Sequence, residues 1–251
     1  IDAFRVKFRT NRKEWLEGLL SFDDIKRYAL YTGTMEIEGN YITKFTYQFT
    51  PFDAMTGLKP RTFEICTPVP MIQKPNEKRG EVRKIDISKF CIGRVKINLL
   101  VFDRDSAFRA RFIEDKRTYG TYLDENGGIR VFRDGVRIYD YGEQGNDWLG
   151  LDSSRINTPG KYLSNNLVLG AVQLEREFSG DLQEKANREG FIENAAYMEF
   201  RDAVSYAINY FTAQRNIDKE SLRVYLNGGK KEPVKEDVSV IRQKIAVYIK
   251  D

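Results

Sequence analysis

The segment Leu167–Val172 reads Leu-Val-Leu-Gly-Ala-Val, and the later segment Asn187–Phe191 reads Asn-Arg-Glu-Gly-Phe. The first is a short apolar run, which is typical of a strand buried in a sheet. After the second, apolar residues return every four positions, as in a helix that packs one face on a core. These positions are Ile192, Ala196, Phe200, Val204 and Ile208. We therefore expect a strand, a charged loop and a long helix over residues 191–212, with Arg188 at the start of the helix.

The chemistry of this loop suits the binding of an anion. The N–H groups at the start of a helix favour negative charge, and an arginine side chain matches the geometry of phosphate oxygens. Arg188 is therefore the first candidate for contact with a phosphate, and Lys185, three residues earlier, is the second. Asn187 is expected to cap the helix by accepting hydrogen bonds from its first N–H groups. In the structural alternative, the arginine only pairs with the glutamates that surround it in sequence.

A second informative stretch begins with a hairpin. The apolar-patterned segments 129–132 and 136–139 flank Asp134 and Gly135, a pair typical of a tight two-residue turn. The block 139–151 that follows is rich in glycine and acidic residues, which predicts a tightly folded loop packed onto the sheet by its tryptophan. Polar loops of this kind often carry contacts to a neighbouring domain or subunit. The candidate contact residues are Arg137, Tyr141, Glu143, Asn146, Asp147 and Trp148.

Together, the two stretches resemble the middle, or transducer, region of the GHKL-superfamily ATPases, which include the gyrase B, heat-shock-90 and MutL proteins. In the chaperones a Gly-Val-Val strand precedes a Ser-Arg-Glu helix start; here Gly170–Val172 precedes Asn187–Glu189. The longer motif, 128–150, is similar to the region after the ATPase domain in bacterial GHKL proteins of poorly defined role. The resemblance covers roughly residues 120–212.

This resemblance implies an ATP-driven function for a longer parent protein. ATP and Mg²⁺ would be bound by an N-terminal ATP-binding domain of the same chain, ahead of Ile1, and the full protein would form a homodimer. Arg188, or else Lys185, would contact the nucleotide phosphate, with Asn187 beside it. The movement of this loop would then couple the nucleotide state to conformation or dimerisation.

The sequence at hand lacks the motifs of a GHKL nucleotide site. That site needs a helix with Glu-x-x-x-Asn-x-x-Asp and a later Asp-x-Gly-x-Gly turn, and neither pattern occurs. The chain also begins at Ile1, without a methionine, which indicates a piece of a longer protein. We therefore expect that this chain alone neither binds nor hydrolyses ATP.

Composition excludes several classes of function. The chain has 251 residues, 41% of them hydrophobic, which is enough for one large domain or two smaller ones. It has no histidine, so histidine-based catalysis and histidine-ligated zinc are excluded, and we expect no metal site. The net charge of +4 is too small to indicate nucleic-acid binding by itself.

Cysteine usage and hydropathy favour a cytoplasmic protein. Cys66 and Cys91 lack the spacing of a zinc pair and are predicted to be buried free thiols in a reducing compartment. The sequence contains neither a run of about 18 apolar residues, as a membrane span requires, nor a signal-peptide pattern.

Hydrophobic patterns predict an α+β fold, in which helices pack on a mixed, mostly antiparallel sheet. The predicted elements besides those above are strands at 4–8, 95–101 and 222–226, a hairpin at 35–49 and a short helix at 15–20. Five of the seven prolines fall in segment 51–88, which predicts a long loop or an inserted element. The expected domains are a β-rich segment 1–90, a transducer-like domain 91–226 and a linker with a C-terminal helix at 227–251.

A non-catalytic binding module for nucleic acid or protein is the alternative function. Basic and aromatic residues alternate in segment 108–122, a composition that suits contact with a nucleic-acid backbone together with base stacking. An ordinary amphipathic segment explains the same pattern, and we favour this simpler interpretation. A surface for a protein client, as in the chaperones, also stays open.

Overall fold

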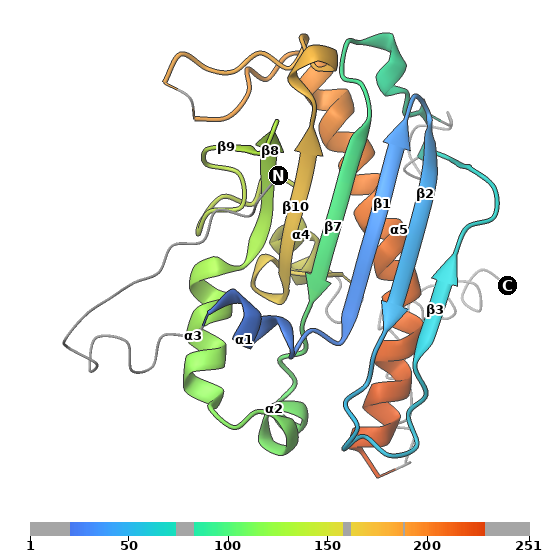
Figure 1. Ribbon diagram of the computed structural model, residues 1–251, viewed down its shortest axis with the longest axis vertical. Coiled ribbons are helices and arrows are strands. Elements are labelled where there is room, and N and C mark those ends of the chain that lie inside the picture. The colour runs from blue at the N-terminus through green and yellow to red at the C-terminus, as the bar shows by residue number, and fades with distance from the viewer. Residues whose placement is uncertain (1–20, 74–82, 158–161, 188, 229–251) are drawn as a thin grey trace, which may run out of the picture.

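The computed structural model describes residues 21–73, 83–157, 162–187 and 189–228. A large twisted sheet runs through the molecule, and the long helix α5 (Ala195–Leu226) lies behind it in Figure 1. No long helix of the described residues covers the face of the sheet that points toward the viewer. The α+β class and the mixed, mostly antiparallel sheet predicted from the sequence are confirmed.

The main sheet has the strand order β3-β2-β1-β7-β10-β8-β9, with β4 paired to β2. Its strands are β1 (Tyr31–Glu38), β2 (Tyr41–Phe49), β3 (Arg61–Glu64), β4 (Val69–Pro70), β7 (Val95–Val101), β8 (Gly128–Arg133), β9 (Val136–Ile138) and β10 (Val168–Leu174). Neighbouring strands are antiparallel except β10 and β8, which are parallel. Strands from both sides of residue 90 therefore belong to one sheet, since β1 pairs with β2 and with β7.

Helices and short connecting elements complete the described residues. They are α1 (Phe22–Lys26), α2 (Ser106–Phe112), α3 (Lys116–Asn126), α4 (Leu151–Asn157), α5, the 3-10 turns Ile87–Lys89, Asn165–Leu167 and Arg176–Phe178, and the separate two-stranded sheet of β5 (Ile72–Gln73) and β6 (Arg83–Lys84). No helix of this described part is long and apolar enough to cross a membrane.

Alternation along the strands produces the core between the sheet and α5. In β1, Tyr31, Met35 and Ile37 are buried, whereas Thr34 points to the open face and is exposed. Gly33 shares the buried side, and a Cβ atom at this position would lie 2.6 Å from the ring of Phe211 in α5. The absence of a side chain thus lets α5 pack closely on the middle of β1.

The long helix differs from its prediction at both ends. It begins at Ala195 instead of residue 191, because Asn194 caps it by accepting a hydrogen bond from the N–H of Tyr197 at 2.9 Å. It continues to Leu226, so the predicted strand at 222–226 is wrong. Leu222 and Leu226 are both buried and lie one helical turn apart, so they extend the core face of α5.

The described residues of the proline-rich segment 51–88 include several short strands. β3 and β4 add to the edge of the main sheet, and Met55, Met71 and Ile85 are buried in the core. Pro70 is tolerated in β4 because an edge strand does not need every N–H group. These strands are only two to four residues long, so the sequence pattern gives little sign of them.

The other local predictions have mixed outcomes. The hairpin at 35–49 and the strand at 95–101 are confirmed, as is the turn at Asp134 and Gly135 between β8 and β9. Cys66 and Cys91 are exposed, so the prediction of buried thiols is wrong. Both lie in connections outside the strands, where burial is not imposed by a sheet. The elements predicted at 4–8 and 15–20, and the helix predicted beyond residue 228, lie outside the described residues.

Candidate functional site

The loop between β10 and α5 folds back on itself and closes at its base. The N–H of Ile192 donates to the carbonyl of Gln183 at 2.8 Å, and the N–H of Lys185 donates to that of Gly190 at 2.9 Å. We call the segment 183–192 the return loop. The tip of the loop therefore contains residues 186–189, which include Arg188 in sequence, while the structure of Arg188 itself lies outside the described residues.

The predicted roles of the residues at this tip need correction. Asn187 does not cap α5: its side-chain oxygen accepts from the N–H of Glu189 at 3.1 Å, and so it forms a turn within the loop. The tip also precedes the N-cap of α5, so the helix-terminus part of the anion argument does not apply. Lys185 is exposed and makes no ion pair with the described residues, which leaves its ammonium group available.

We call the two ends of the return loop, together with residues 179–182 that precede it, its stem. Arg133, at the end of β8, holds this stem. Its side chain is 8% exposed and donates to the carbonyls of Ser179 at 3.0 Å and Leu182 at 2.6 Å. It also pairs with Glu184 at 3.0 Å, and its guanidinium carbon lies 4.9 Å from the ring centroid of Phe191. Burial lowers the pKa of Arg133, and the carboxylate of Glu184 opposes this effect.

Sequence reasoning missed Arg133, although a signal was present. Alternation places it on the same face of β8 as Ile129 and Val131, which are buried. A charged residue at a buried strand position needs partners nearby, and the carbonyls of a folded loop supply them here.

Tyr141 joins the two stretches that the sequence singled out. Its hydroxyl oxygen accepts a hydrogen bond from the N–H of Phe191 at 2.8 Å, and its side chain is 5% exposed. A Cβ atom on Gly190, whose φ is +80°, would lie 3.1 Å from this hydroxyl, so glycine allows the close approach. Burial raises the pKa of Tyr141 above its ordinary value, which keeps the phenol neutral.

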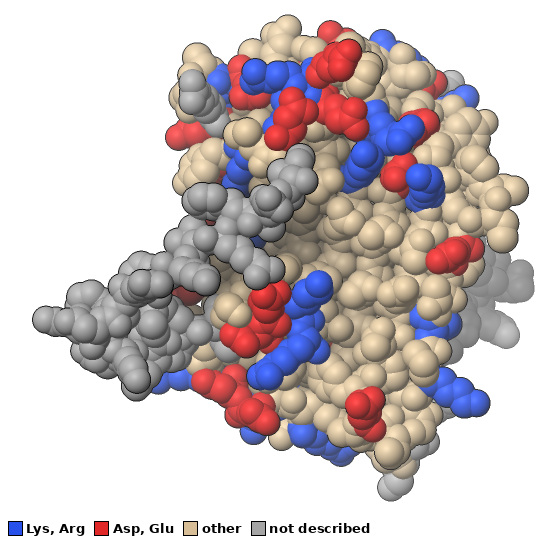
Figure 2. Space-filling model, viewed as in Figure 1, with Lys and Arg blue, Asp and Glu red and all other residues tan. Residues whose placement is uncertain are grey.

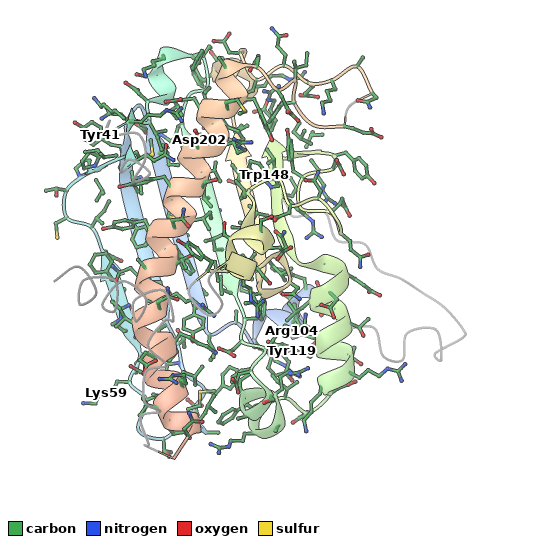
Figure 3. All side chains as sticks on the ribbon, turned by 180° about the vertical axis from the view of Figure 1, so that it is seen from behind. Tyr41, Lys59, Arg104, Tyr119, Trp148 and Asp202 are labelled. Carbon is green, nitrogen blue, oxygen red and sulfur yellow. The ribbon has the colours of Figure 1, made fainter. Side chains whose placement is uncertain are left out.

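Trp148 packs its loop against the helix side of the sheet. Its indole N–H donates to the carbonyl of Ile129 at 2.9 Å, and its ring stacks on Phe200 of α5 with 5.9 Å between centroids. Figure 3 shows Trp148 beside α5. The ring of Tyr141 lies 4.9 Å away, so the aromatic cluster connects the loop, the strand and the helix.

The polar candidates in loop 139–151 bond to partners within the loop and beside it. Asp147 accepts from the N–H groups of Leu151 at 2.7 Å and Asp152 at 3.0 Å, and so caps α4. The side-chain amide of Asn146 donates to Asp140 at 2.8 Å. Arg137 and Glu143 form an ion pair. These bonds fix the shape of the loop that receives Tyr141.

A pocket of 320 Å³ opens where the return loop meets loop 139–151. Two cations line it, Lys185 from the return loop and Arg201 from α5, together with four carboxylates, those of Asp140, Asp147, Glu189 and Glu193. The pocket therefore offers both positive and negative groups at an accessible surface. Sequence reasoning missed Arg201, because a charged residue on the exposed side of a predicted helix is ordinary and does not indicate a site.

The described residues contain no group of three or more carboxylates or cysteines arranged to hold a metal ion. Comparison of the chain with protein-family models, with curated proteins and with solved structures finds no match.

Proposed function

We propose that this chain is the transducer region of a GHKL-type ATPase of the cytoplasm, which supplies an arginine to the nucleotide phosphate of a preceding ATP-binding domain. The observation that carries this proposal is the bond between Tyr141 and the N–H of Phe191. It joins the two motifs of the resemblance, which are far apart in sequence, into one structure.

The geometry of the return loop suits such a role. Its stem is fixed by Arg133 and Tyr141, whereas the side chains of Ala186, Asn187 and Glu189 at its tip are exposed. ATP and Mg²⁺ would be held by the preceding domain. Arg188, with Lys185 as the second candidate, would stabilise the charge that develops on the transferred phosphoryl group, mainly by positioning and electrostatics.

The same stem would transmit the nucleotide state. A force on the tip reaches β8 through Arg133 and reaches loop 139–151 through Tyr141. These elements belong to the main sheet or pack on it, so movement of the tip would shift the transducer as a body. The parent protein would use this shift to change conformation or to close a homodimer.

The test is ATP turnover by the longer protein that contains this chain, with nucleotide affinity measured in parallel. We expect Arg188→Ala to lower turnover at least ~10-fold while affinity is largely kept, because arginine fingers contribute up to about 10³–10⁵ in rate. Arg176→Ala is the matched control, since this nearby arginine is 72% exposed and its ion pair with Glu184, at 3.7 Å, is long. If only Lys185→Ala lowers turnover, lysine is the catalytic cation. If neither does, the proposal is wrong.

A non-catalytic binding module is the competing function. It predicts that the longer protein binds its partner equally well with and without ATP. The transducer predicts ATP-dependent dimerisation, which analytical ultracentrifugation of the longer protein with and without a non-hydrolysable ATP analogue distinguishes.

A further inference from the structure

The open face of the main sheet contains a cavity of 560 Å³. Residues of five adjacent strands line it, in the order β2, β1, β7, β10 and β8, and α1 and α3 close one end. Figure 2 shows this face; to the right of the grey atoms, its middle has few charged side chains. The cavity lies on the side of the sheet opposite to α5.

A row of four short side chains and one arginine forms the floor of this cavity. Residues directly opposite one another on neighbouring strands form the row Thr46, Thr34, Asn98, Ala171 and Arg130. Four strand spacings of about 4.8 Å give the row a length of about 19 Å. The row thus forms a shallow polar track across the sheet, and a guanidinium group stands at one end.

No hydrogen bond or ion pair within the described residues accounts for the position of Arg130. It makes no ion pair or hydrogen bond with the described residues, and its Nε atom is buried without a partner. Burial lowers its pKa, the nearby guanidinium of Arg137 acts in the same direction, and the carboxylate of Glu143, which pairs with Arg137, opposes both. A cation kept half-buried beside an accessible cavity favours an anion from outside the chain.

The remaining lining adds aromatic rings and a second cation. Phe22, Tyr122 and Phe132 bring aromatic rings to the cavity, and Lys26 adds a second cation. The lining residues include no aspartate or glutamate. Of the aromatic residues in segment 108–122, Phe108 and Tyr119 are fully buried, whereas Tyr122 reaches this surface.

We propose that this face binds a single-stranded nucleic acid along the row from Thr46 to Arg130. Bases would stack on the aromatic rings, hydroxyl and amide groups of the floor would meet base edges, and phosphates would approach Arg130 and Lys26. The length of the row fits several successive nucleotides rather than one. An acidic peptide would also approach Arg130, but it would leave the aromatic rings without planar partners.

Binding is measured by fluorescence anisotropy with the 251-residue chain and fluorescein-labelled 20-mers of deoxythymidylate and uridylate. We expect binding that weakens as salt rises, because neutralised phosphates release counterions. Asn98→Glu places a negative charge in the middle of the row at an exposed position and should weaken binding at least ~10-fold. Arg130→Gln should weaken binding about 5- to 10-fold. It should also reduce the slope of log affinity against log salt concentration by about 1, because one phosphate contact is lost.

The control places the same charge on the other side of the molecule. Ala213→Glu lies at an exposed position of α5 and should leave the affinity unchanged. The proposal is overturned if neither 20-mer binds, or if Asn98→Glu and Ala213→Glu weaken binding equally. It is also overturned if uridine monophosphate competes as strongly as the 20-mer, since the site would then take free nucleotides. Circular dichroism of each variant excludes unfolding, and none of these outcomes depends on Arg188.

Discussion

Two arginines on opposite faces of the main sheet, Arg61 and Arg130, differ in their partners. On the face covered by α5, Arg61 donates to both carboxylate oxygens of Asp218, at 3.0 and 2.9 Å, and Tyr47 donates to the same carboxylate at 2.6 Å. On the open face, Arg130 has no partner among the described residues. A buried charge in a core must be paired to be tolerated, whereas an unpaired charge beside a cavity indicates a surface that binds something.

The largest expected effect comes from breaking the pairing on the covered face. Asp218→Ala leaves Arg61 and Tyr47 without their acceptor, so we expect the free energy of unfolding to fall by about 3 kcal/mol. Urea denaturation measures this loss. Glu220→Ala, an exposed carboxylate of the same helix, should cost about 0.5 kcal/mol or less. Equal losses in the two variants would contradict the contrast between the faces.

A smaller effect is expected at the aromatic stem of the return loop. Tyr141→Phe removes the acceptor for the N–H of Phe191 and should lower the free energy of unfolding by about 1 kcal/mol. Tyr139→Phe is the matched control, because Tyr139 is 54% exposed. A loss no greater than that of the control would mean that the stem is held by packing alone.

The burial of Tyr141 also predicts how stability depends on pH. Unfolded tyrosine ionises near about pH 10, whereas burial raises the pKa of Tyr141 in the folded protein. The unfolded state therefore loses its proton first, and stability falls as pH rises above about 10. We expect this fall to be less steep in Tyr141→Phe than in the wild type. Parallel curves would contradict a buried, neutral phenol.

The smallest effect on stability is expected on the open face. Arg130→Leu removes a half-buried cation that no internal group satisfies, so the free energy of unfolding should change by less than about 0.5 kcal/mol. Arg61→Leu should cost clearly more, because it leaves Asp218 unpaired. If the two arginines cost the same, Arg130 has a structural role and the comparison between the faces fails.

The sequence predicted those elements whose side chains follow one clear period. The strands at 95–101 and 168–174 and the turn at Asp134 and Gly135 are examples, because alternation or turn chemistry is local information. The return loop was harder. Its stem depends on Tyr141 and Arg133, whose partners lie far away in sequence, and its N-cap moved to Asn194 because a tight turn intervenes.

The open face shows the same limit in another form. Thr34, Asn98 and Arg130 are unremarkable in sequence and become a row only because four strands, β1, β7, β10 and β8, pair in register. The segment with the clearest basic and aromatic alternation instead places Phe108 and Tyr119 in the core. Composition indicates a function poorly when the sheet register decides which side chains meet.

The most direct test of the proposed function is the ratio of ATP turnover between Arg188→Ala and Arg176→Ala in the longer protein. The two changes remove the same charge from the same connection, but only Arg188 lies on the tip of the return loop. We predict near wild-type turnover for Arg176→Ala and a loss of at least ~10-fold for Arg188→Ala. Equal turnover in the two variants would contradict a role for this loop at the nucleotide phosphate.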